Sequence, residues 1–129
     1  MANLTANRNL PERLGNRFGY PVAAGARIFR GALMALTAAG LVVRPGDAGA
    51  AVVVGLSPTE ADNRDGADGA IVLEPKHGTF PMTVPGAVHT NIGDPVYCTD
   101  DNTLTLTAST NLKVGKLAGI EAGQTFVEV

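Results

Sequence analysis

The sequence contains no tryptophan, two tyrosines and four phenylalanines, so aromatic rings cannot dominate its core. Its hydrophobic content is nevertheless 45%, which is ordinary for a folded protein. The core must therefore be built mainly from Val, Leu, Ile and Ala, which suits a small barrel. Cys98 is the single cysteine. It excludes an intrachain disulfide framework and fits a reducing cytoplasm.

Long hydrophobic runs are also missing. The longest apolar run, residues 31–43, is shorter than the roughly 20 residues that a membrane-spanning helix requires. The first residues contain no apolar stretch of the kind found in signal peptides. We therefore expect a protein without membrane contact. Sixteen glycines and eight prolines are too many for a helical bundle.

The C-terminal third, residues 91–129, has the pattern of short strands joined by tight turns. Its short runs of β-branched, aromatic or Leu residues are bounded by Gly, Pro, Asp or Asn. The segment 99–103 (Thr-Asp-Asp-Asn-Thr) is the strongest turn signal, because Asp and Asn side chains hydrogen-bond to nearby backbone. Leu104 and Leu106 then alternate with threonines, which predicts a strand with one apolar face.

A short internal repeat relates this segment to an earlier one. Aligning Gly31 with Gly93 places Val42 on Leu104, and a two-residue gap then places Val54-Gly55 on Val114-Gly115. Taken alone, residues 32–39 could form a helix capped by Gly40, because Ala, Leu and Met are good helix formers. The second copy contains Asp94-Pro95 and a Thr-rich stretch, so the repeat predicts strand–turn–strand for residues 31–43 as well.

The middle of the chain adds further strands. We expect a buried strand at 51–56, a solvated polar loop at 58–69 and a strand at 70–74. The prolines in 75–85 restrict that segment to an edge or bulged strand, because proline cannot donate to a ladder. The predicted fold class is thus all-β, with residues 19–129 forming one small β-barrel or β-sandwich domain of short antiparallel strands.

Residues 1–18 have too few apolar positions for a core face and are predicted to form an extended N-terminal arm. Fully extended, 18 residues reach up to ~60 Å. Residues 1–44 carry six Arg against one Glu (+5), and residues 45–129 carry four basic against eleven acidic residues (−7). A basic end on an acidic body favours contact with acidic surfaces, including a second copy. Chance scatter of charge and a frayed terminus remain alternatives. The predicted interface residues are Leu4, Arg8, Leu10, Arg13, Leu14, Arg17 and Phe18.

Signatures of catalysis, metal binding and cofactor binding are absent from the sequence. The acidic stretch 62–69 lacks the spacing of a helical-hand calcium loop. His77 and His89 have no third ligand at a recognisable zinc spacing, and Cys98 lies in an apolar run that suits a buried thiol. No nucleophile elbow, nucleotide-binding glycine motif or basic–aromatic nucleic-acid surface is present. We expect a non-enzyme with no cofactor, no metal and no nucleic-acid partner.

The whole chain resembles the small capsid cement (head decoration) proteins of tailed bacteriophages and prophages. The segments that carry the resemblance are Met1-Ala-Asn-Leu-Thr, residues 20–33, Val54-Gly-Leu, residues 62–70, residues 92–101, Val114-Gly and the final Phe-Val-Glu-Val. These are soft motifs without a chemical signature. In residues 31–39 the sequence is richer in Ala than a strand of such a protein should be.

The resemblance implies a small β-barrel on the outer surface of an icosahedral head, made in the bacterial host cytoplasm. Its partners would be the major capsid protein and itself, with a homotrimer favoured over a dimer. It would stabilise the shell after expansion, with residues 1–18 lying on the capsid or on a sister subunit. Two alternatives remain: a small β-barrel ligand-binding domain or enzyme with His77 and His89 around a pocket, and another phage structural part such as a tail or connector subunit.

Overall fold

Short β-strands make up almost all of the regular structure of the body. The computed structural model describes residues 2–15 and 17–129; Met1 and Asn16, which belong to the predicted arm, lie outside the described residues. The strands are β1 (Tyr20–Pro21), β2 (Arg27–Ile28), β3 (Leu33–Leu36), β4 (Val42–Val43), β5 (Val52–Leu56), β6 (Ala61–Asp62), β7 (Val72–Leu73), β8 (Thr79–Pro81), β9 (Pro95–Cys98), β10 (Leu104–Thr105), β11 (Leu112–Glu121) and β12 (Gln124–Glu128), with a single 3₁₀ turn η1 (His89–Asn91).

These strands pair in antiparallel sheets. The orders are β10-β9-β11-β12-β8, β4-β3-β5, β1-β7 and β2-β6. The predicted all-β class of short antiparallel strands is therefore confirmed. Among the described residues the pairings do not join into one closed ring, so the body is a set of packed small sheets.

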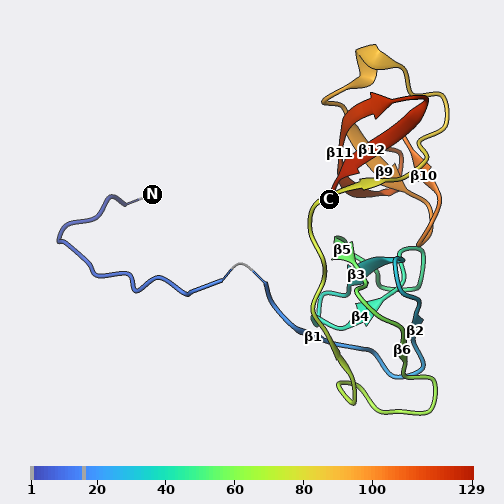
Figure 1. Cartoon of the computed structure of the whole chain (residues 1–129). Coiled ribbons are helices and arrows are strands. Elements are labelled where there is room, and N and C mark those ends of the chain that lie inside the picture. Colours follow the sequence, from blue (N-terminus) through green and yellow to red (C-terminus); the bar gives the residue numbers. More distant parts are fainter. Residues whose placement is uncertain (1, 16) are drawn as a thin grey trace.

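The body has two lobes, and the N-terminal arm leaves it near β1 and runs away from both (Figure 1). We call β1–β7 the N-lobe and β8–β12 with η1 the C-lobe. The chain passes between them next to its C-terminal residue, since the amide and carbonyl of Gly78 exchange hydrogen bonds with those of Val129. The amide of Leu33 in the N-lobe donates to the carbonyl of Asp101 in the C-lobe at 3.0 Å, so a backbone hydrogen bond joins the two lobes in addition to packing.

The internal repeat is present in the strand pairing. In the N-lobe β3 is flanked by β4 and β5, and in the C-lobe β9 is flanked by β10 and β11. The registers match: Leu36 faces Val42 across β3–β4, and the aligned residues Cys98 and Leu104 face each other across β9–β10. Residues 31–43 therefore form strand–turn–strand and not a helix, as the repeat predicted.

Each copy also contains the same β-bulge. The pairing of β3 with β5 skips Val54, and that of β9 with β11 skips Val114, its aligned residue. A bulge adds one residue to one strand and sharpens the local twist. The glycine that follows each bulge, Gly55 or Gly115, lies against a crossing backbone: the carbonyl of Lys76 in the first copy and of Glu128 in the second.

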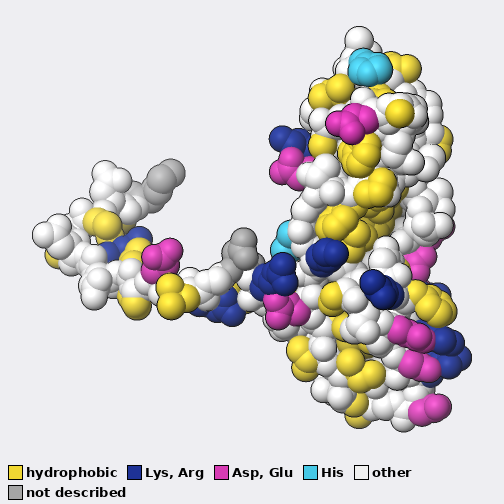
Figure 2. All heavy atoms as spheres, viewed as in Figure 1, with side chains coloured by type: hydrophobic (Ala, Val, Ile, Leu, Met, Phe, Trp, Pro, Cys, Tyr) yellow, Lys and Arg dark blue, Asp and Glu magenta, His cyan; other side chains and the backbone are white. Residues whose placement is uncertain are grey.

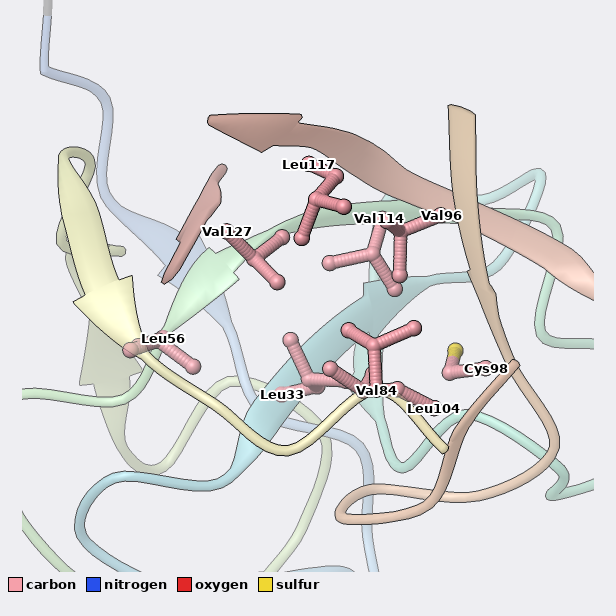
Figure 3. Packing of buried hydrophobic residues seen from close by; sticks show 9 residues of the cluster. All are labelled: Leu33, Leu56, Val84, Val96, Cys98, Leu104, Val114, Leu117 and Val127. Carbon is pink, nitrogen blue, oxygen red and sulfur yellow. The ribbon is translucent and has the colours of Figure 1, made fainter. Parts of the chain in front are cut away.

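Two hydrophobic clusters share strand β3. Nine buried residues form the C-lobe cluster (Figure 3): Leu33, Leu56, Val84, Val96, Cys98, Leu104, Val114, Leu117 and Val127. Met34 and Leu36 point into the second cluster, with Val22, Ile28 and Val42. Because β3 lies between two cores, all four of its residues are buried, and the alternation of a half-exposed strand is absent. This explains the Leu-Met-Ala-Leu sequence that also suits a helix.

The predicted strand at 51–56 is present as β5, but its burial differs from the expectation. Val52 is 51% exposed, and only Gly55 and Leu56 are buried. The run of valines is apolar because Val53 packs on one cluster and Val54 on the other. The proline-containing segment was placed correctly: β8, which ends at Pro81, is an edge strand of the five-stranded sheet.

Candidate functional site: the N-terminal arm and its groove

The described arm residues form no helix or strand and are exposed along their whole length. All seven predicted interface residues lie on this segment, with Leu4 67% exposed, Leu10 69%, Leu14 88% and Phe18 47%. Figure 2 shows hydrophobic and basic side chains along the arm. Burial of such side chains is worth about 1.5–3 kcal/mol each. A segment that leaves four of them in solvent therefore keeps a large amount of apolar surface uncovered.

Arginine contacts hold the base of the arm in place. The guanidinium of Arg13 lies 4.0 Å from the ring centroid of Phe18 and donates to the carbonyls of Gly15 (3.1 Å) and Arg17 (3.2 Å). Arg17 Nη1 lies 3.9 Å from Glu74 Oε1 on the body. Each contact is exposed and weak on its own. Together they set the direction in which residues 2–12 leave the body.

An apolar groove of about 220 Å³ lies where the arm meets the body. Its lining comes from the arm base, from both copies of the repeat and from the segments that cross them: Phe18, Tyr20, Val53, Val54, Pro75, His77, Val114 and Val129. Val54 and Val114 are the two bulge residues, so the groove lies between the two copies. The sequence predicted the arm but not this groove, because its walls come from five separate stretches of chain.

The two histidines do not form a joint site. His77 is exposed at the groove, whereas His89 is exposed in η1, and the two lie far apart on the surface (Figure 2). Across the described ranges, no group of three or more His, Cys, Asp or Glu side chains is placed to hold a metal ion.

Cys98 is buried in the C-lobe cluster between β10 and β11. Burial, with smaller contributions from the carboxylates of Asp100 and Asp101, raises the pKa of its thiol to about 11. The thiolate is the nucleophilic form, so a thiol with this pKa is chemically unreactive near neutral pH.

The acidic loop 58–69 contains a structural residue that its composition does not reveal. We expected a solvated loop, yet Asn63 is only 3% exposed. Its side-chain amide donates to the carbonyls of Val22 (3.2 Å), Ala23 (3.0 Å) and Ala67 (2.9 Å). Asn63 thereby ties the loop to the segment after β1. The only available sequence signal was an Asn three residues before a glycine, which is common in exposed loops as well.

The exposed parts of the same loop are held by local charge pairs. Asp62 accepts hydrogen bonds from Arg64 Nε (2.8 Å) and Nη2 (2.7 Å), and this guanidinium lowers the pKa of Asp62 to about 2. Asp68 accepts from the amide of Ala24 at 2.7 Å. Two of the loop's carboxylates thus have partners within the protein, which leaves them poor candidates for calcium ligands.

No family model, curated protein or solved structure matches this chain. In the part of the chain that the structure describes, no helix is long and apolar enough to cross a membrane.

Proposed function

We propose that this protein is a capsid cement protein that binds the outer surface of a tailed-phage head and stabilises the lattice of major capsid proteins. In this proposal it acts as a homo-oligomer, with a trimer favoured over a dimer, and performs no catalysis. The observation that carries the proposal is the exposed arm: a segment with four uncovered large apolar side chains and three arginines, attached to an all-β body.

The energetics of the arm favour several simultaneous contacts over a single one. Complete burial of four large apolar side chains yields about 6–12 kcal/mol before any costs. Association loses an estimated 4–15 kcal/mol of translational and rotational freedom, and each ordered side chain costs roughly 0.5–1.5 kcal/mol more. A single arm on a single partner is therefore marginal. Several copies in one oligomer, each facing an equivalent lattice site, multiply weak contacts into strong avidity.

Charge supports the same assignment. Within residues 1–18, three arginines stand against Glu12, for a net charge of +2, while the remaining residues carry seven basic and eleven acidic groups, for −4. Arg17 already pairs with Glu74 of the body. A basic arm on an acidic body is attracted to acidic surfaces on a neighbouring subunit or on the shell, and the effect weakens with salt.

Cosedimentation with phage heads tests the proposal. A variant that lacks residues 2–18 should keep the melting temperature of the body, because the arm contributes nothing to either hydrophobic cluster. It should lose attachment to expanded heads. The full-length protein should bind expanded heads and not unexpanded procapsids.

A matched pair of arm variants separates apolar contact from mere length. Replacing Leu4, Leu10 and Leu14 by Ser should weaken attachment to heads strongly. Replacing Asn3, Asn7 and Asn9 by Ser on the same segment should leave it nearly unchanged. Decoration at full occupancy by the arm-deleted protein would refute the role given to the arm.

A further inference from the structure

We propose that the groove between the two repeat copies is the receptor for the arm of a second copy of this chain. The inference extends the role proposed for the arm and names the surface that receives it. The groove is lined by the bulge residues Val54 and Val114, with Pro75, His77 and Val129 beside them.

The structure already shows how arm residues sit at this place. Phe18 lines the groove while the neighbouring Arg17 pairs with Glu74, which directly precedes Pro75 of the groove wall. The binding surface is thus apolar with a carboxylate at its rim. Phe18 forms one wall of the groove, and the carboxylate of Glu74 already pairs with Arg17 of the same chain.

The same pairing of chemistries recurs farther along the arm. Arg13 precedes Leu14 directly, and Arg8 precedes Leu10 by two positions. In the isolated chain, Leu10 and Leu14 are 69% and 88% exposed. The arm therefore carries further large apolar side chains close to arginines, and Leu10 and Leu14 are uncovered.

Leu10 and Leu14 do not contact the groove of their own chain. The contacts of Arg13 with Phe18, Gly15 and Arg17 direct the preceding residues away from the body, and Figure 1 shows the arm leaving both lobes. Residues 2–12, fully extended, span roughly 35 Å. This length is more than twice the radius of gyration of a compact chain of this size, about 14 Å, so the arm is long enough to extend to an adjacent copy, and reciprocal exchange of arms would close a symmetric oligomer.

Cross-linking between copies tests the proposal directly. Cys98 is buried and can stay in place. Protein with His77→Cys is mixed with protein carrying one arm cysteine, at Asn3, Asn7 or Asn9, and the mixture is oxidised. All four positions are exposed, so folding should be unaffected. At least one arm position should give a covalent dimer with His77→Cys. Thr90→Cys, exposed in η1, is the control and should give none above background.

Sedimentation measures the same contact without a cross-link. Replacing Leu4, Leu10 and Leu14 by Ser should raise the dissociation constant of the oligomer by about tenfold or more per leucine. The Asn3, Asn7 and Asn9 to Ser variant should not. Two results would overturn the proposal: a wild-type protein that stays monomeric, or no arm position that cross-links to His77→Cys above the Thr90 control.

These outcomes are separable from the proposed function. A monomer that still decorates heads would overturn the arm exchange and leave the cement role standing. An arm-exchanged oligomer that does not bind heads would overturn the cement role and leave the arm exchange standing.

Discussion

Gly115 tests how closely two strands of the C-lobe approach each other. A Cβ at this position would coincide with the backbone carbonyl oxygen of Glu128 and would lie 2.9 Å from its carbonyl carbon. The obstacle is backbone, so no side-chain rotation can relieve the clash. Gly115→Ala therefore forces β11 and β12 apart where Lys116 pairs with Glu128.

The expected cost follows from two contributions. Overpacking of a tight contact costs typically about 1–3 kcal/mol. Weakening the adjacent ladder adds about 1 kcal/mol for each of one or two hydrogen bonds. The sum, about 2–5 kcal/mol, is a large part of the roughly 5–15 kcal/mol that stabilises a domain. For a chain of this size it lowers the melting temperature by about 8–18 °C.

Thermal and urea unfolding measure the change, and Gly119→Ala is the matched control. Gly119 lies on the same strand, and an added Cβ there meets nothing within 4 Å. The control should be neutral or slightly stabilising, because alanine reduces the entropy of the unfolded chain. Equal stability of the two variants would refute the close approach at Gly115. Gly55→Ala should also destabilise the protein, since its Cβ would lie 2.8 Å from the carbonyl oxygen of Lys76 and its φ of +144° adds backbone strain.

Three further changes test other parts of the structure. Asn63→Ala should lower the free energy of unfolding by about 2–3 kcal/mol, because its hydrogen bonds are lost. Asn63→Asp should lower it further at pH 7, because a carboxylate would face three carbonyl oxygens. Equal losses of stability in the two variants would contradict this geometry. Cys98 should resist a thiol reagent at pH 8 in the folded protein and react once urea unfolds it, since burial raises its pKa to about 11; rapid labelling of the folded protein would show an accessible thiol. The backbone amides of Asn102 and Thr103 lower the pKa of Asp100, so its stabilising contribution is present above its ordinary pKa and is lost as the pH falls through the lowered one. Asp100→Ala should make the loss of stability below about pH 4, the ordinary pKa of Asp, shallower, as followed by melting temperature. An unchanged loss of stability in acid would argue against these hydrogen bonds.

The parts of the fold that were predictable are set by local chemistry. The turn at 99–103 was recognisable because Asp100 can accept from the amides two and three residues on, and it does so at 2.8 and 2.6 Å. The edge position of β8 followed from proline's missing amide hydrogen. The lack of helix and strand in the described residues of 1–18 agrees with the absence of a periodic apolar face there. Each signal lies within a few residues and does not depend on the rest of the chain.

What could not be predicted depends on distant segments. The burial of β3 on both faces requires two cores, and the second core brings in residues as far away as Leu73. The burial of Asn63 depends on carbonyls some 40 residues away in sequence. The groove at the base of the arm depends on where β5, β11 and the crossing segments come together. Composition and residue spacing do not predict such contacts between segments that are distant in the sequence.

The internal repeat was visible in the sequence although it depends on contacts between distant segments, and its glycines explain why. In each copy another backbone segment crosses close to the residue after the bulge, so only glycine fits there. The crossing segments have no resemblance in sequence: Pro75-Lys76-His77 in one copy and Val127-Glu128-Val129 in the other. They also arrive by different routes, the first after the acidic loop and β7, the second through the β11–β12 hairpin. The two Val-Gly pairs therefore recur in the sequence because both copies make the same close contact with a crossing backbone. Gly55→Ala and Gly115→Ala would each disrupt this contact.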